Sequence, residues 1–135
     1  MKLDDIDQKI IDTLEKDART PFLKIARTLK VSEGTIRKRV AKLVENKTIK
    51  KFTVELRYTS QVIIGIETNP HKPTTEIVQE LIKMDVKKVL EVAGRFDLIC
   101  MLSRKSLEEV NDVLEKIRVL EGVEHTETFT ILKEN

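Results

Sequence analysis

The sequence contains few of the residues from which catalytic and metal-binding sites are built. Its 135 residues include one cysteine, two histidines and no tryptophan. A single Cys and two distant His residues do not give a zinc-ligand spacing. The sequence also has no nucleophile elbow, zinc-protease motif or phosphate-binding loop. We therefore expect no metal, no cofactor and no enzymatic activity.

The sequence also lacks any apolar run long enough to cross a membrane. Its first residues do not have the pattern of a signal peptide. The one cysteine, Cys100, lies in the apolar run Leu98–Leu102, which indicates a buried small hydrophobic residue in a reducing compartment. We therefore expect a cytoplasmic protein that has no membrane partner.

Aromatic residues are scarce, at 4% of the chain. After Tyr58 only Phe96 and Phe129 remain. A sheet that stacks RNA bases needs exposed aromatic side chains and a basic surface. Residues 59–135 contain 10 Lys or Arg against 14 Asp or Glu, so this half is acidic. RNA binding by this half is therefore disfavoured.

The sequence has a marked excess of positive charge in its first half. Residues 1–58 contain 15 Lys or Arg against 9 Asp or Glu, and residues 24–51 contain ten basic residues against two acidic ones. Phosphate contacts of a DNA-binding protein are made mainly by such clusters. The charge pattern predicts that any polyanion binding is confined to the first half.

Three amphipathic helices are predicted in the basic half, over residues 5–16, 21–29 and 33–45. Asp4, Thr20 and Ser32 precede them as expected N-caps. The third helix has apolar residues on one face and Lys or Arg mostly off it. Two short helices joined by a tight turn are typical of a helix-turn-helix unit. The plainer alternative is an ordinary helical domain with solvated Lys and Arg.

An extended segment follows the third helix. Ile49, Phe52, Val54 and Leu56 are typical strand residues, so we expect a bulged strand that gives the helical unit a wing. We assign residues 1–52 to the helix-turn-helix domain, 53–60 to a linker and 61–135 to a second domain.

The second domain alternates between strand and helix patterns. Strands are predicted over 62–67, 86–93, 98–102 and 124–132. One helix is predicted over 75–83, capped by Thr74, and another after a capping box at Ser106 and Glu109. The order βαββαβ predicts a ferredoxin-like sandwich, and hence an α+β protein overall. One face of its sheet would be bare and carry Ile63 or Ile64, which predicts at least a dimer.

Several motifs in order resemble the Lrp/AsnC (leucine-responsive, feast/famine) family of bacterial and archaeal regulators. They are Leu3-Asp4 with Asp7, Ile10, Ile11 and Leu14; Asp17-Ala18-Arg19; Ile25-Ala26, Val31-Ser32 and Arg37 to Leu43; Gly94-x-Phe96-Asp97; and Gly122-Val123 with Thr126 and Thr128. The resemblance implies a transcriptional regulator that forms dimers and often octamers. The abundance of Lys, Glu and Ile favours a thermophilic source, and with the resemblance we expect the source to be archaeal or thermophilic.

The resemblance also implies an amino-acid effector site. Its residues would be Gly94, Arg95, Phe96, Asp97, Thr126 and Thr128. The glycine allows backbone N–H groups to approach a carboxylate, and Asp97 is suited to an α-ammonium group. Without the resemblance, Asp97 would be interpreted as a solvated carboxylate in a turn. Thr126 and Thr128 would be interpreted as ordinary strand residues.

The sequence thus predicts a regulator that binds double-stranded DNA. Residues 33–35 and Arg37 are expected to contact base edges, because they lie near the start of the third helix. The full predicted DNA-binding set is Ser32, Glu33, Gly34, Thr35, Arg37, Lys38, Arg39, Lys42, Lys50 and Lys51. The alternative is an amino-acid-binding assembly protein without specific DNA recognition.

Overall fold

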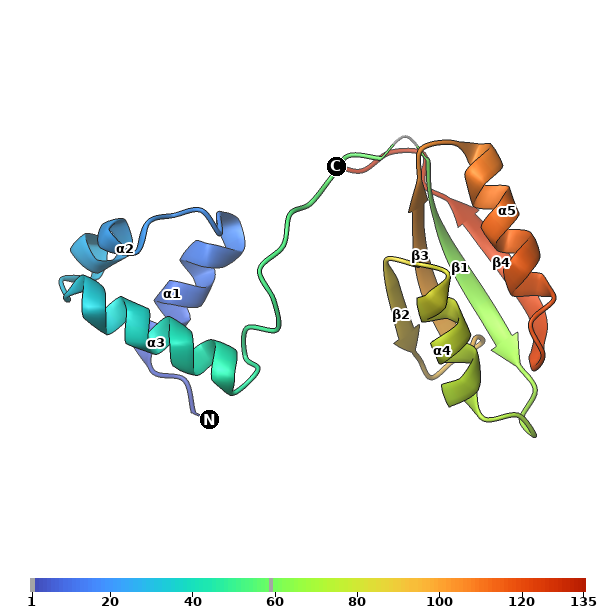
Figure 1. Cartoon of the computed structure of the whole chain (residues 1–135), viewed down its shortest axis with the longest axis horizontal. Coiled ribbons are helices and arrows are strands. Elements are labelled where there is room, and N and C mark those ends of the chain that lie inside the picture. Colours follow the sequence, from blue (N-terminus) through green and yellow to red (C-terminus); the bar gives the residue numbers. More distant parts are fainter. Residues whose placement is uncertain (1, 59) are drawn as a thin grey trace. The chain divides into compact units, whose positions relative to one another are not determined.

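The computed structural model describes residues 2–58 and 60–135 (Figure 1). The chain divides into two compact units, with the boundary between Glu55 and Leu56. That boundary falls inside the predicted linker 53–60. Residue 59 of that linker, and residue 1, lie outside the described residues.

The first unit is the expected bundle of three helices. They are α1 (Asp5–Lys16), α2 (Phe22–Leu29) and α3 (Glu33–Glu45). Their apolar stripes meet in one buried cluster, because each helix repeats its apolar residues at intervals of three and four. The cluster consists of Ile10, Leu14, Ile25, Ala26, Ile36, Val40 and Leu43. The small Ala26 is only 2% exposed.

The helix caps agree with the sequence at two of three positions. Asp4 caps α1 in a reciprocal capping box with Asp7, and the Ser32 hydroxyl accepts the backbone N–H of Thr35 at 3.1 Å. The prediction for Thr20 is wrong. Its hydroxyl donates to the carbonyl of Asp17 at 2.7 Å, and Pro21 becomes the N-cap of α2 without a side-chain bond.

The predicted wing strand is wrong. Within the described residues, positions 50–58 contain no helix or strand. Phe52, Val54 and Leu56 are 53%, 74% and 56% exposed. An isolated extended segment has no partner for its backbone hydrogen bonds, so strand propensity alone does not form a strand. Ile49, in contrast, packs against the core of the first unit.

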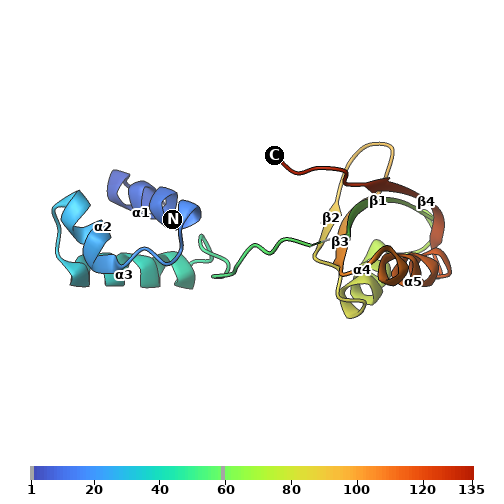
Figure 2. The same cartoon turned by 90° about the horizontal axis from the view of Figure 1, so that it is seen from above.

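The second unit has the predicted βαββαβ order. Its elements are β1 (Ser60–Thr68), α4 (Thr74–Lys83), β2 (Lys88–Glu91), β3 (Leu98–Arg104), α5 (Leu107–Arg118) and β4 (Val123–Thr130). The sheet order is β2-β3-β1-β4, with every neighbouring pair antiparallel. Figure 2 shows α4 and α5 on the same side of this sheet. The ferredoxin-like fold is therefore confirmed.

Three local predictions in this unit need correction. β2 has four residues rather than the predicted 86–93. Thr74 is the first helical residue of α4, not its cap, and Pro73 precedes it without a side-chain bond. Ser106 does cap α5 by accepting the Glu109 N–H, but the Glu109 carboxylate accepts from the N–H of Lys105 instead of Ser106.

The core of the second unit lies between the sheet and its two helices. Val62, Ile64 and Ile66 point into it from β1, and each is no more than 2% exposed. Ile64 is therefore not on the bare face, whereas the intervening Ile63 is half-buried and belongs to that face. Cys100 is fully buried, as expected, and desolvation raises the pKa of its thiol to about 11.

Candidate nucleic-acid interface and ligand-binding region

The start of α3 presents an exposed polar edge. The hydroxyls of Ser32 and Thr35 are 2.8 Å apart, and Gly34 between them is exposed. Arg37 forms an ion pair with Glu33 at 2.6 Å, and its guanidinium lies 5.7 Å from the centroid of the Phe22 ring. The Arg37 side chain is still 66% exposed. These two groups of contacts lie side by side in sequence at the start of α3, where polar side chains can read base edges.

Four predicted phosphate-binding lysines are free to meet an anion. Lys38, Lys42, Lys50 and Lys51 are exposed. Among the described residues none of them has a carboxylate partner. An exposed, unpaired ammonium retains its full charge for a phosphate group.

Arg39 has a different environment from these four lysines. Its Nη1 atom lies 2.6 Å from Asp4 Oδ2 and 3.0 Å from Asp7 Oδ1, and its side chain is only 29% exposed. The hydrogen bond from the Asp7 backbone N–H, followed by that from Arg39, lowers the pKa of the Asp4 carboxyl. Arg39 therefore connects the middle of α3 to the first turn of α1.

The sequence pattern does not predict this cluster of Arg39, Asp4 and Asp7. From the sequence, Asp4 and Asp7 are only residues suited to a helix start. The one clue in the sequence is that Asp7 lies next to the apolar stripe of the first helix. In the structure Asp7 is only 7% exposed. A carboxylate with so little exposure needs a cationic partner.

In the second unit, the Gly94–Asp97 turn is fixed to the end of β1. The backbone N–H of Asp97 donates to the carbonyl of Ile66 at 2.9 Å. Asp97 Oδ2 accepts from the Thr68 N–H at 2.7 Å and from its hydroxyl at 3.1 Å. Gly94 has a φ of +149°, which favours glycine. The Asp97 carboxylate is thus held in place at the end of the sheet.

Phe96 lies across the bare face of the sheet. A Cβ atom added at Gly65 would be 2.6 Å from the Phe96 ring, so the ring covers that glycine directly. The guanidinium of Arg95 lies 5.4 Å from the ring centroid, and its Nη2 atom is 3.2 Å from Glu127 Oε2. That oxygen is buried and has no hydrogen bond among the described residues. No sequence motif marks Gly65 or Glu127 as part of this region.

Thr126 and Thr128 lie on the other side of the sheet. They pair directly with Ile66 and Ile64 of β1, whose side chains are in the core beneath the helices. Directly paired residues of antiparallel strands point to the same face. The structure therefore places Gly94, Arg95, Phe96 and Asp97 in one turn at the end of β1, while Thr126 and Thr128 lie further along β4 and face the opposite side of the sheet from Phe96.

Metal clusters and membrane-spanning helices are absent from the part of the chain that the structure describes. Residues 2–58 and 60–135 contain no group of three His, Cys, Asp or Glu side chains arranged to hold a metal ion. None of the helices in these ranges is long and apolar enough to cross a membrane.

Comparisons with known proteins cover both units. A family model for the AsnC-type helix-turn-helix domain matches residues 3–44, and a model for the Lrp/AsnC ligand binding domain matches residues 61–135. The chain is 36% identical to the HTH-type transcriptional regulator LysM of Sulfurisphaera tokodaii, over 97% of this chain and 96% of that protein.

Solved structures are similar over the same length. LrpC of B. subtilis has a TM-score of 0.82 at 26% identity, with 100% of this chain and 98% of LrpC covered. The feast or famine regulatory protein Rv3291c of M. tuberculosis, solved in complex with L-methionine, has a TM-score of 0.87 at 21% identity, with 98% and 94% covered.

Proposed function

The chain belongs to the Lrp/AsnC family of transcriptional regulators, and from this we propose that it binds double-stranded DNA through α3 and regulates transcription in response to an amino acid. The observation that carries the DNA-binding proposal is the exposed basic surface of α3 and the segment after it. Its lysines have no carboxylate partners in the described ranges. Such a surface gives salt-dependent affinity for a polyanion.

The start of α3 is the proposed base-reading edge. In helix-turn-helix proteins the N-terminal residues of the recognition helix enter the major groove. Ser32, Glu33, Gly34, Thr35 and Arg37 occupy those positions here. Lys38, Lys42, Lys50 and Lys51 are proposed to bind phosphates. Because Arg39 is already paired with two carboxylates, we assign it a positioning role rather than a phosphate contact.

The proposed effector is a free amino acid at the Gly94–Asp97 turn. L-methionine is bound in the M. tuberculosis relative. In this chain the fixed Asp97 carboxylate offers an acceptor for an α-ammonium group, and Arg95 offers a cation for a carboxylate. Thr126 and Thr128 are proposed to contribute from the helix side of β4.

We further propose that the protein is a homodimer through the bare face of the second unit, and that dimers assemble into octamers. Phe129 is 47% exposed on that face and is paired with Ile63. An exposed apolar sheet face usually marks an assembly surface. The proposed site of action is the cytoplasm, where the chromosome of a bacterium or archaeon lies.

Fluorescence anisotropy tests the proposal. Labelled duplex from upstream of the protein's own gene is compared with random duplex, with and without pooled amino acids. We expect tight, salt-sensitive preference for the upstream duplex, with an affinity that changes when amino acids are added. A preference for the upstream duplex that does not change when amino acids are added would contradict the effector role. No preference at any salt concentration would favour the assembly protein without specific DNA recognition.

Substitutions separate base reading from phosphate binding. Arg37→Ala should weaken binding to the specific duplex more than to random duplex. Lys50→Ala should weaken binding to the two duplexes equally. It should also reduce the slope of log affinity against log salt concentration by about 0.9 for each phosphate that Lys50 neutralises. Lys16→Ala, which removes an exposed charge from the far end of α1, is the control and should change neither. Equal weakening on both duplexes for Arg37→Ala and Lys50→Ala would contradict this assignment.

A further inference from the structure

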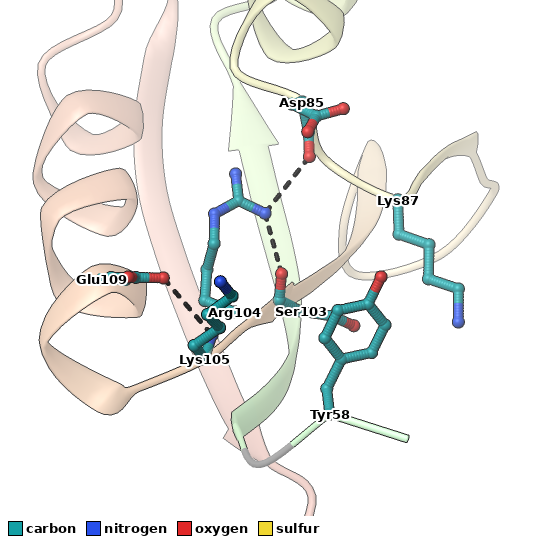
Figure 3. Close-up of a pocket in the computed structure, with 7 residues that line it drawn as sticks. All are labelled: Tyr58, Asp85, Lys87, Ser103, Arg104, Lys105 and Glu109. Atoms are coloured by element: carbon teal, nitrogen blue, oxygen red, sulfur yellow. Dashed lines mark hydrogen bonds between the residues drawn. The ribbon is translucent and has the colours of Figure 1, made fainter. Parts of the chain in front are cut away.

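A concave site lies at the far end of β3 from the Gly94–Asp97 turn (Figure 3). β3 separates the two by seven residues, which corresponds to about 20 Å along a strand. The pocket has a volume of about 390 Å³. That is within the range of pockets that hold small metabolites. It is lined by Tyr58, Asp85, Lys87, Ser103, Arg104, Lys105 and Glu109.

The Arg104 guanidinium in this pocket is fixed in place but keeps its charge. It donates to the carbonyl oxygens of Met84 and Ser103, each at 2.8 Å, and to that of Asp85 at 3.3 Å. Carbonyl groups satisfy hydrogen bonds without neutralising a cation. Within residues 2–58 and 60–135, Arg104 forms no ion pair.

Lys87 adds a second cation without a counter-ion. Its ammonium lies 5.8 Å from the centroid of the Tyr58 ring, and it too forms no ion pair within the described ranges. Figure 3 shows Lys87 and Tyr58 on the same side of the pocket. The lining also includes the carboxylates of Asp85 and Glu109, and Glu109 accepts from the backbone N–H of Lys105. Against them stand the cations of Lys87, Arg104 and Lys105, so the lining has a net positive charge in an otherwise acidic unit, which favours an anionic partner.

We propose that this pocket binds a small oxyanion, a carboxylate or phosphate group held by Arg104 and Lys87, with Tyr58 against the body of the ligand. Both terminal nitrogens of Arg104 already donate to carbonyl oxygens, so this guanidinium attracts either group mainly by its charge. The lysine ammonium adds a mobile second charge that can donate directly to the oxyanion. This site is separate from the proposed amino-acid site and does not depend on DNA binding. Because Tyr58 belongs to the predicted linker 53–60, an occupied pocket holds the end of the linker against the sheet.

The chain provides its own reporter for the test. Tyr58 is the only tyrosine and there is no tryptophan, so tyrosine fluorescence comes from this pocket alone. Sodium phosphate and sodium succinate are titrated separately into the full chain at constant ionic strength, with sodium chloride as the screening control. Isothermal titration calorimetry is run on the same samples. We expect a saturable fluorescence change and matching heat with at least one of the two oxyanions, and none with chloride.

The two titrations identify the source of the oxyanion. Saturation by phosphate alone assigns a phosphate site, and saturation by succinate alone assigns a carboxylate site. Saturation by both anions supports one site that binds either a carboxylate or a phosphate through the same charged groups. Neither a fluorescence change nor heat with either anion would overturn the proposal.

Matched variants then locate the binding. Lys87→Gln should weaken the affinity roughly tenfold, because it removes one charge-assisted hydrogen bond. Lys88→Gln, at the next position on the sheet edge, removes the same charge and should leave the affinity unchanged. Lys116→Gln, an exposed lysine in the last turn of α5, is a second control and should also leave the affinity unchanged. Equal weakening in Lys87→Gln and Lys88→Gln, or weakening in Lys116→Gln alone, would contradict binding in this pocket.

Discussion

At the scale of single residues, Arg39 links two helices through two carboxylates. Asp7 is almost fully buried, so removing Arg39 leaves its charge without a partner. We expect Arg39→Gln to destabilise the first unit by about 1–3 kcal/mol, measured by urea unfolding. Lys38→Gln, an exposed neighbour without an ion pair, is the control and should have little effect. An unchanged midpoint for Arg39→Gln would contradict the linking role.

The same interaction predicts a pH dependence. The pKa of Asp4 is lowered in the folded chain, chiefly by the Asp7 N–H and then by Arg39. A carboxyl with a depressed folded pKa contributes stability above its unfolded pKa, and that contribution disappears as pH falls through the folded pKa. We therefore expect the stability of the first unit to drop as pH falls below the ordinary value of 3.8. Arg39→Gln should make this drop smaller, as followed by circular dichroism.

Gly65 and Phe96 form the second residue-scale interaction. A Cβ at position 65 would lie 2.6 Å from the Phe96 ring, so Gly65→Ala should destabilise the second unit by about 1–3 kcal/mol. In a Phe96→Ala background the same change should have a much smaller effect, because the ring is gone. A double-mutant cycle in urea measures the difference. Additive effects would show that the ring does not occupy this space.

Residue roles that depend on local sequence are predictable, and those that depend on tertiary structure are not. Ser32 as a cap and Cys100 as a buried residue follow from neighbours a few positions away. The partners of Arg39 are 32 and 35 residues distant in the chain. Gly65 meets Phe96 only after β1 and β3 have paired. No local sequence pattern specifies which residues far apart in the chain will come into contact.

At the scale of elements, the turn between α2 and α3 contains a strained residue. Lys30 has φ 56° and ψ 43°, in the left-handed region. A residue with a Cβ atom is disfavoured there by about 1 kcal/mol. We expect Lys30→Gly to stabilise the first unit by up to that amount in thermal unfolding. Lys24→Gly, in the first turn of α2, is the control and should destabilise the unit, because glycine is a poor helix former.

The elements themselves are largely predictable from periodicity and caps. Helices α1 and α3 have the expected bounds because their apolar spacing and first-turn acids are clear signals. The wing strand does not form although Phe52, Val54 and Leu56 alternate as a strand should. A strand exists only with a partner, and none is present beside this segment in the described residues.

At the scale of the whole molecule, the bare sheet face predicts the assembly state. Phe129→Asp places a charge on that face and should convert the proposed dimer into a monomer, as measured by light scattering after size exclusion. Leu107→Asp changes an apolar residue of similar exposure, 59%, at the start of α5 and should leave the mass unchanged. A Phe129→Asp protein with the wild-type mass would place the interface elsewhere.

The chain builds its two hydrophobic cores from entirely different residues, one before position 50 and one after position 60. Substitutions that repack one core do not alter the packing density of the other. Selection can therefore act on the proposed effector preference and on the proposed operator choice as separate traits. A lineage can change the effector while its set of controlled genes stays the same, and it can acquire new genes while it keeps the effector.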